Sequence, residues 1–189
     1  MINIRRAEFA EIEKLWRERL WPQRKSAIEP NSAMILGGGI DLSYMNEEPQ
    51  FWIAEDLRED LRTDSQDESQ GESPERPRAI GCLSGHFAGE FTDRNRPGRL
   101  YRSRGLWVDQ SRRRRGIARQ LMRELIEHAR SQDAVAIWTF PRKTAMPFYE
   151  SMGFRMWSTW LPQQEGDSDL NCYAILELEA AKSSESSSR

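Results

Sequence analysis

The sequence predicts a mixed α/β fold, of class α/β (α+β), on three observations. Residues 106–129 pass from an apolar strand through a polar turn into an amphipathic helix. That strand begins at residue 100, and the apolar runs 79–91 and 100–108 are joined by the polar turn 92–98, which predicts a β-hairpin. Residues 7–20 repeat apolar side chains at the spacing of one helix face. Strands and helices are therefore mixed along the chain.

The other elements follow from the same periodicities. Pro22 ends the first helix, and Asn31 is a candidate N-cap for a short helix over residues 33–36. The triple glycine at 37–39 lacks the spacing of a nucleotide-binding loop and predicts a turn. The remaining predicted strands are residues 1–6, 51–54, 134–140, 155–161 and 171–178.

One domain, residues 1–179, accounts for the chain most simply. A length of 189 residues with 38% hydrophobic residues is enough for a sizeable core. Residues 57–78 are acidic, rich in Ser, Gln and Pro and without aromatic side chains, which predicts a mobile loop. A domain boundary is the alternative there, but too little chain precedes it for a separate core. The Ser-rich tail 180–189 is predicted to be disordered.

Charge and cysteine content narrow the function classes. Charged residues make up 31% of the chain, yet the formal net charge is −2, which disfavours a nucleic-acid binder. Cys82 and Cys172 lie in apolar, strand-like stretches and are expected to be buried thiols, with a disulfide or metal site disfavoured. No apolar run approaches about 18 residues, and no signal peptide is recognisable. We therefore expect a cytoplasmic protein without membrane association.

The stretch from Leu106 to Arg119 carries the strongest functional signal. Gly116 opens the helix, and the first N–H groups of a helix have no acceptor within it. With the positive end of the helix dipole, these groups form an anion site. The run Arg112–Arg115 adds positive charge at the same place, which suits a phosphate or pyrophosphate. The alternative is a solvated basic turn.

Two motifs make the sequence resemble one family. Arg113-x-x-Gly116-x-Ala118 matches the pyrophosphate loop Arg/Gln-x-x-Gly-x-Gly/Ala of the GNAT (Gcn5-related N-acetyltransferase) superfamily. Residues 145–154 resemble that family's Ala-x-x-x-Tyr-x-x-x-Gly-Phe segment, which forms a helix and the turn into a strand. The resemblance implies a mixed, mostly antiparallel central sheet of about six to seven strands with helices on both faces. It also implies acetyl-CoA as co-substrate and no metal.

The resemblance also implies where acetyl-CoA binds. In the family, the pantetheine arm lies between two splayed strands, here those of residues 100–108 and 134–140. Backbone groups of the first strand bind pantetheine, and amides of the turn hold the pyrophosphate, where a side chain at Gly116 would block close approach. Arg142 stands where the family often has an asparagine, so it faces either cofactor or substrate. The implied cofactor-binding residues are Leu106, Trp107, Val108, Arg113, Arg114, Arg115, Gly116, Ile117, Ala118, Arg119 and Arg142.

Tyr149 falls where the family has a tyrosine that protonates the departing CoA thiolate. An unperturbed phenol, with a pKa of about 10, is protonated at neutral pH and able to donate. The alternative is a core residue of an amphipathic helix. The general base stays open, and an acceptor with an α-amine needs none. Its candidates are Glu55, Asp56, Glu90 and His86.

Four arginines suggest an acceptor that carries an anionic group. Arg102 and Arg104 alternate onto one face of the strand 100–108. Arg24 and Arg142 flank two other segments that border the acceptor cleft in the resembling family. Arginine suits bidentate contact with carboxylate, so an amino acid is favoured over a polycation. Alternatively, each arginine pairs with an acid of the chain, or acids hold the amine. The acids in question are Glu47, Glu48 and Glu55.

The favoured hypothesis is an N-acyltransferase that moves acetyl from acetyl-CoA to a primary amine of a small molecule or peptide by direct attack. Two others stay open: an acyl-CoA-binding regulatory module without catalysis, and a nucleic-acid binder using Arg112–Arg115. The acceptor and the oligomeric state, monomer or homodimer, are not predicted.

Overall fold

The computed structural model describes residues 1–57, 78–91, 97–162 and 170–179. The predicted mobile loop, apart from its two end residues, and the predicted disordered tail lie outside the described residues, as does most of the hairpin turn. The chain forms two units, which we describe separately. The first comprises Met1–Ser32, Asn46–His86 and Ser103–Leu125, and the second comprises Ala33–Met45, Phe87–Arg102 and Ile126–Arg189.

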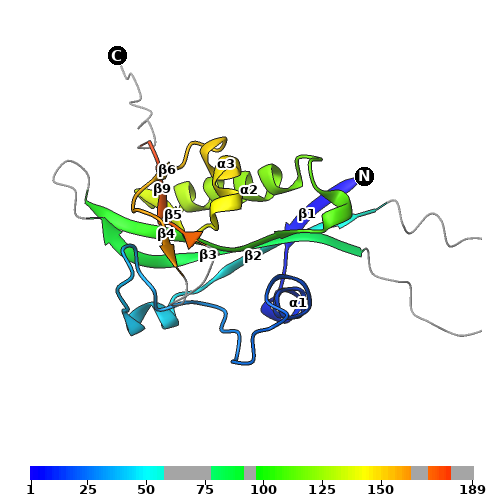
Figure 1. Ribbon diagram of the computed structural model, residues 1–189, viewed down its shortest axis with the longest axis horizontal. Helices are drawn as coiled ribbons and strands as arrows, with labels where there is room; N and C mark the ends of the chain where they lie inside the picture. Colours follow the sequence, from blue (N-terminus) through cyan, green and yellow to red (C-terminus); the bar gives the residue numbers. More distant parts are fainter. Residues whose placement is uncertain (58–77, 92–96, 163–169, 180–189) are drawn as a thin grey trace, which may run out of the picture. The chain divides into compact units, whose positions relative to one another are not determined.

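A seven-stranded mixed sheet has the strand order β1-β2-β3-β4-β5-β9-β6 (Figure 1). β1 pairs with β2, β2 with β3, and β9 with both β5 and β6, all antiparallel, whereas β4 and β5 are parallel. The predicted mostly antiparallel sheet is thereby confirmed. The strands are β1 Ile2–Arg6, β2 Gln50–Asp56, β3 Arg78–Phe91, β4 Gly98–Val108, β5 Ala136–Thr139, β6 Arg155–Met156 and β9 Ala174–Glu177, with β7 Leu161–Pro162 and β8 Leu170–Asn171 as a separate pair.

The helices match the apolar periodicities of the sequence, with one exception treated below. The described helices are α1 Phe9–Leu15, the π-helix Trp16–Leu20, α2 Ile117–Ser131 and α3 Met146–Glu150, with 3-10 turns at Leu42–Asn46, Gln110–Arg112 and Lys143–Ala145. None of the helices in the described part of the chain is long and apolar enough to span a membrane.

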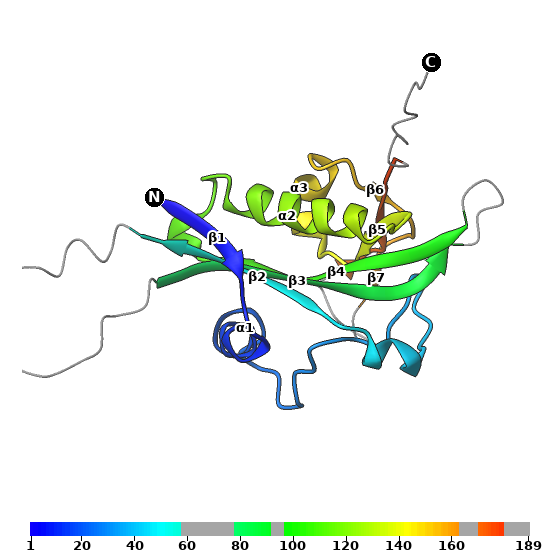
Figure 2. The same ribbon diagram turned by 180° about the vertical axis from the view of Figure 1, so that it is seen from behind.

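Helices cover both faces of the sheet in the first unit. Cys82 of β3 packs in a cluster with Ile12 of α1 and Trp16 of the π-helix. At the neighbouring Gly81, a Cβ would meet the Ile117 side chain of α2 at 3.1 Å. Because adjacent residues of a strand point to opposite faces, α1 and the start of α2 cover opposite faces (Figure 2). The absent side chain of Gly81 lets α2 approach the sheet closely.

The predicted helix over residues 7–20 is present, but its last turn is a π-helix. A capping box between Glu8 and Glu11 begins α1. At the other end, the Trp21 N–H donates to the Trp16 carbonyl at 2.7 Å, five residues back, just before Pro22 ends the helix. The wider turn brings the rings of Trp16 and Trp21 to 5.1 Å.

The predicted second helix over residues 33–36 is wrong. Met34 instead forms an isolated β-bridge with Ile40, around the turn that the triple glycine predicted. Gly37 and Gly38 are both left-handed, with φ of +89° and +92°, which ends any helix within one turn. A helix of four residues cannot repay its costly nucleus. Nor does Asn31 cap a helix, since its side-chain amide donates to the Glu47 carbonyl.

The second unit is built around aromatic residues. Trp138 of β5 is fully buried and donates its indole N–H to the Ala88 carbonyl at 2.7 Å. The predicted strands 155–161 and 171–178 are each broken in two. At the break, the Ser158 hydroxyl accepts the Tyr173 N–H at 2.9 Å, so that a side chain replaces a ladder partner. Both cysteines are buried free thiols, as predicted.

Candidate functional site

The turn between β4 and α2 is fixed by one aspartate. β4 ends at Val108, and the Asp109 N–H still donates to the Ile80 carbonyl at 2.9 Å. The Asp109 carboxylate then accepts from the Ser111 N–H at 2.9 Å and from its hydroxyl at 2.6 Å. The bond from the hydroxyl is the main cause of the lowered pKa of Asp109. This local motif sets the conformation in which the arginine run begins.

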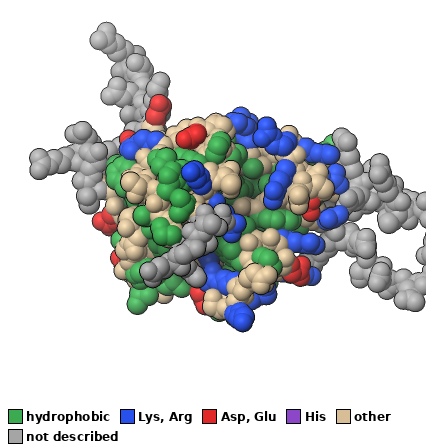
Figure 3. Space-filling view, in the orientation of Figure 1, with side chains coloured by type: hydrophobic (Ala, Val, Ile, Leu, Met, Phe, Trp, Pro, Cys, Tyr) green, Lys and Arg blue, Asp and Glu red, His purple; other side chains and the backbone are tan. Residues whose placement is uncertain are grey.

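The four arginines of the run are not equivalent. Arg112 Nη1 lies 3.1 Å from the carboxylate of the buried Asp56. Arg113 Nε donates to the carbonyl at the end of β4 at 3.3 Å. Arg114 and Arg115 are exposed, and arginine and lysine side chains are prominent on the surface (Figure 3). Arg112 and Arg113 thus stabilise the turn, whereas Arg114 and Arg115 present positive charge to solvent.

The backbone at the start of α2 suits an anion. Arg114 and Gly116 are both left-handed, with φ of +64° and +79°, and such turns gather successive N–H groups into an anion-binding concavity. Gly116 accepts from the Gln120 N–H at 3.0 Å, which begins α2. A Cβ at Gly116 would meet only the Gln120 side-chain nitrogen, at 3.9 Å, so the protein leaves that space open. Binding of a pyrophosphate at this turn stays a prediction.

The strand before the turn is predicted to bind pantetheine. The parallel register of β4 with β5 runs from Leu100, opposite Ala136, to Arg102, opposite Trp138. Leu106, Trp107 and Val108 lie beyond that register and are half-buried. Trp107 packs against the core of the first unit, so its side chain has a structural role. Backbone binding of pantetheine by these residues stays a prediction.

Tyr149 lies in α3 of the second unit and is buried. Burial raises the pKa of Tyr149 to about 12, while a hydrogen bond with Thr139 acts in the opposite direction. Its ring packs edge-on against Phe148 and Phe154 at 5.2 and 5.4 Å. The phenol is therefore protonated at neutral pH and held by packing. Its predicted role as an acid stays a prediction.

Arg142, where the resembling family often has an asparagine, is exposed. Its backbone bridges that of Asn171, whose side-chain amide donates to the Phe140 carbonyl at 2.9 Å. Asn171 is buried, so a buried asparagine does lie beside this segment, although it comes from another part of the chain. Whether Arg142 contacts cofactor or substrate stays open.

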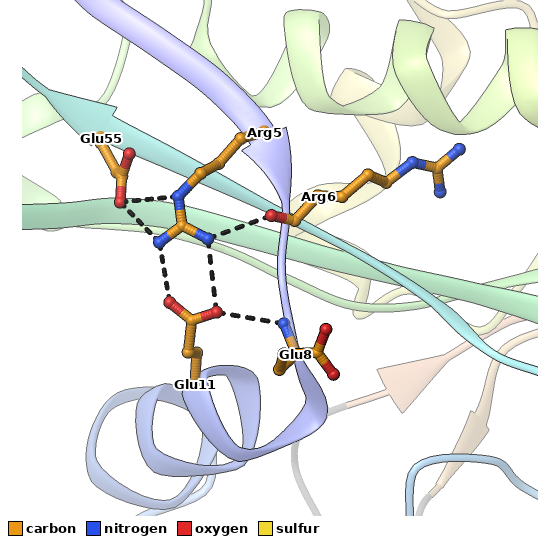
Figure 4. A network of polar contacts seen from close by, with 5 residues as sticks. All are labelled: Arg5, Arg6, Glu8, Glu11 and Glu55. Carbon is orange, nitrogen blue, oxygen red and sulfur yellow. Dashed lines mark hydrogen bonds and ion pairs between the residues drawn. The ribbon is translucent and has the colours of Figure 1, made fainter.

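Glu55, a candidate acid of the acceptor site, is engaged in an ion-pair network (Figure 4). Arg5 donates to Glu55 through Nε at 3.0 Å and Nη2 at 2.7 Å, and it reaches Glu11 at 2.7 Å. These bonds, most of all that with Glu11, raise the pKa of Arg5. The carboxylate of Glu55 is thus already satisfied by a fixed cation, which favours a structural role.

The other base candidates also have structural contacts or lie on the surface. Asp56 pairs with the N-terminal amine at 3.5 Å as well as with Arg112. His86 is fully buried, with Nε2 3.2 Å from the Ser32 N–H nitrogen. Glu90 is exposed.

Of the candidate substrate arginines, Arg104 is held by the first unit itself. Its Nη1 donates to the carbonyls of residues 29, 30 and 31 at 2.6, 3.2 and 3.2 Å. Its guanidinium also lies 4.9 Å from the Trp16 ring centroid and 5.3 Å from that of Trp21. Arg24 is exposed, donates to the Ser26 hydroxyl and stacks near Trp21. Arg102 belongs to the second unit, where it is buried.

Sequence reasoning missed the groups that hold these arginines. Trp16 lies within the apolar stripe predicted for residues 7–20, and Trp21 lies just beyond it. Their contact with Arg104 joins segments about 85 residues apart, and the alternation of polar and apolar residues carries no sign of it. The one local signal of this contact is the pair Trp16 and Trp21 just before Pro22.

Comparison with known proteins gives the class of protein to which this fold and turn belong. The family model described as "Acetyltransferase (GNAT) family" matches residues 39–154. The chain therefore belongs to the GNAT acetyltransferase family. No curated protein sequence is a match for it.

Solved structures of low sequence identity share the fold. A structure of Arabidopsis thaliana NAA60 with a bisubstrate analogue has a TM-score of 0.63 and 16% identity, covering 96% of this chain and 100% of that one. An acetyltransferase of the GNAT family from Staphylococcus aureus Mu50 has a TM-score of 0.56 and 18% identity, with coverages of 95% and 100%. An aminoglycoside 6'-N-acetyltransferase with coenzyme A has a TM-score of 0.55 and 13% identity, with coverages of 95% and 98%.

Proposed function

We propose that this chain transfers the acetyl group of acetyl-CoA to a primary amine. The observation that carries the proposal is the turn at Gly116, a left-handed glycine with open space above it at the start of a 15-residue helix. Family membership supports the same chemistry. Exposed Arg114 and Arg115 add positive charge beside the turn for the phosphates of CoA.

The reaction is a direct attack. The neutral amine adds to the acetyl carbonyl carbon, and the carbon–sulfur bond then breaks. The products are the acetylated amine and CoA with a free thiol. The amine nitrogen loses one proton and the sulfur gains one, so acetyl-CoA and the amine alone balance the reaction. A covalent cysteine intermediate is disfavoured, because burial raises the pKa of Cys82 to about 12 and also raises that of Cys172.

Tyr149 is the proposed donor to the departing sulfur. Support comes from its position in the segment that resembles the family motif and from a pKa that keeps the phenol protonated. A thiol has a pKa of about 8.5, so the free phenol is a weaker acid than the group it would protonate. Its first contribution is then a hydrogen bond to the developing thiolate.

The acceptor class stays open between small molecules and peptides. Solved structures with this fold include a NatC complex bound to Gag peptide and CoA, as well as the aminoglycoside 6'-N-acetyltransferase. Similarity of fold at this identity does not choose between them. We expect a cytoplasmic enzyme, and either a monomer or a homodimer.

The proposal is tested in two steps. Acetyl-CoA should raise the melting temperature of the full chain, and the acetyl analogue without the nucleotide, S-acetyl pantetheine, should raise it less. Release of free thiol from acetyl-CoA is then screened against amino acids, polyamines, aminoglycosides and short peptides. Binding without thiol release for any acceptor would favour the acyl-CoA-binding module instead, and absence of binding would reject both.

A further inference from the structure

Arg102 is a buried arginine of the second unit that forms no ion pair with the other described residues. It is 8% exposed. Its guanidinium lies over the Trp138 ring, 4.6 Å from the centroid. Nη1 donates to the Met34 carbonyl at 3.4 Å, and Nη2 lies 3.7 Å from the Met34 sulfur. These are the long, weak contacts of a neutral carbonyl and a thioether.

The hydrogen-bonding capacity of Arg102 is largely unused. A guanidinium carries five N–H donors, and the Nε of Arg102 has no partner among the described residues. Buried charges in proteins are normally paired or fully hydrogen-bonded. Two less buried arginines have stronger partners: Arg5 donates to two carboxylates and Arg104 to three carbonyls. Arg102 thus lacks an anion that its burial calls for.

Arg102 lies beside an aromatic part of the second unit's core, where Met34 and Phe140 pack against Trp138 and Tyr173. Trp138 and Phe140 flank the buried Tyr173, with ring centroids 5.9 and 4.6 Å from its ring. The Tyr173 hydroxyl lies 3.9 Å from the same Met34 sulfur that Arg102 contacts. Burial raises the pKa of Tyr173, and the charge of Arg102 opposes that rise, so the two groups interact. A cation and a phenol donor therefore converge on one flexible side chain beside an aromatic wall.

We propose that Arg102 binds a carboxylate of the acceptor, with Tyr173 as a second donor. The proposal rests on acetyl transfer to an amine and names its substrate class: an amine that carries both a carboxylate and an apolar body. A carboxylate matches the planar guanidinium with two parallel hydrogen bonds. The Met34 side chain, whose sulfur lies 3.7 Å from Nη2, has three rotatable bonds with which to move aside for a carboxylate. The carboxylate belongs either to a free amino acid or to an acidic side chain of a peptide.

The alternative role for Arg102 is structural: its contacts with Met34 would stabilise the segment around that residue. The two roles predict opposite effects on stability. Replacing a structural arginine lowers the stability of the fold. Replacing an arginine that is buried for ligand binding leaves the stability unchanged or raises it. We therefore expect Arg102→Gln to melt at the same temperature as the wild type or higher. Arg99→Gln is the matched control, because Arg99 lies on the same strand, stacks on Phe87 at 3.8 Å and is exposed.

Binding is measured directly with 3-phenylpropionate and its uncharged amide, by quenching of tryptophan fluorescence in the full chain without acetyl-CoA. We expect the carboxylate to bind at least about tenfold more tightly than the amide, in wild type and in Arg99→Gln. Arg102→Gln should bind both equally. This readout is independent of catalysis, so it stays informative if acetyl transfer itself is disproved.

Kinetics then separate the two sources of the carboxylate. Thiol release is compared for phenylalanine, phenylalanine amide and peptides with a neutral or acidic second residue. A preference for the free amino acid that is lost in Arg102→Gln supports the α-carboxylate, and a preference for the acidic peptide supports a side chain. If Arg102→Gln fails to fold, Arg102→Lys replaces it and should retain only part of the preference. Three results would overturn the proposal. The wild type binds both probes equally, the preference survives in Arg102→Gln, or that variant has a lower melting temperature with unchanged probe binding.

Discussion

The indole N–H of Trp16 donates to the carbonyl of Gly105 at 2.8 Å, and the ring lies directly over the glycine. Gly105 is left-handed, with φ of +68°, and this breaks the alternation of side chains along β4. As a result, Arg104 and Trp107 both contact the cluster around Trp16, although three positions separate them. The π-helix that follows α1 therefore holds this strand at Gly105, upstream of the Gly116 turn.

Gly105→Ala should be strongly destabilising. Its Cβ would lie 2.3 Å from the Trp16 ring, which is rigid and fully buried, and the left-handed backbone adds strain. We expect a loss of about 2–4 kcal/mol in the free energy of unfolding, measured by urea denaturation. Gly37→Ala is the control, because Gly37 is equally left-handed with nothing within 4 Å, so it should cost only about 1 kcal/mol. Equal losses in the two variants would mean that the contact with Trp16 adds nothing.

The sequence was sufficient where a feature depends on neighbouring residues. The arginine run, Gly116 and the apolar face of α2 lie within about 20 positions, and local backbone chemistry specifies them. The π-turn at Trp16 and the left-handed Gly105 could not be predicted, because they meet through a hydrogen bond between residues 89 positions apart. The second predicted helix failed for a related reason: apolar spacing at 33–36 was real, but two left-handed glycines outweigh it.

Gly116→Leu should abolish the rise in melting temperature that acetyl-CoA produces. A Cβ at Gly116 would meet nothing closer than the Gln120 side-chain nitrogen at 3.9 Å, so the new side chain would start from open space and enter the position proposed for the phosphates. The left-handed backbone adds strain of about 1–3 kcal/mol. Gly37→Leu carries the same kind of strain far from the turn in sequence and should keep its response to acetyl-CoA. A folded Gly116→Leu variant with a normal response would rule out this turn as the cofactor site.

Charge alone could not assign roles to the arginines. Seen in the sequence, Arg104 and Arg102 are equivalent members of one strand. In the structure, Arg104 donates through Nη1 to three carbonyls, whereas Arg102 has one long bond to a carbonyl and one contact with a thioether sulfur. The number of acceptors around each guanidinium depends on the tertiary structure. The pattern of apolar residues in the sequence does not report it.

Arg112→Ala and Arg115→Ala should fail in different ways. Loss of Arg112 removes a partner from the buried Asp56 and should cost about 1.5–3 kcal/mol of stability. Loss of the exposed Arg115 should leave stability unchanged, raise the Kd of acetyl-CoA and reduce the dependence of that Kd on salt. Urea denaturation and calorimetric titration at two salt concentrations distinguish the variants. If Arg115→Ala binds acetyl-CoA with the wild-type salt dependence, the run is a solvated turn.

The protein should lose stability in alkaline solution between about pH 10 and 12. An unfolded tyrosine ionises near pH 10, whereas burial raises the pKa of Tyr149 to about 12 in the folded chain. A raised folded pKa gives stability that is fully present below pH 10 and lost as pH rises toward 12, about 3 kcal/mol for two pH units. Tyr149→Phe removes this ionisation, so its unfolding free energy should fall less over the same range. A parallel fall in both proteins would show that Tyr149 is not the group responsible.

Tyr149→Phe should lower kcat and kcat/KM together while the Kd of acetyl-CoA is unchanged, as for an interaction made mainly in the transition state. A phenol with a pKa of about 12 is about 3.5 units weaker than a thiol, so complete proton transfer to sulfur is uphill by about 5 kcal/mol. A hydrogen bond to the developing thiolate needs no such transfer and contributes about 1.5–3 kcal/mol. We therefore expect a loss of roughly 10- to 100-fold, below the ~10²–10⁴-fold typical of a full general acid. Phe148→Leu, which alters a ring packed against Tyr149 but leaves its hydroxyl in place, is the control and should stay within a few-fold of wild type. Full kcat in Tyr149→Phe would mean that water or another group serves the thiolate.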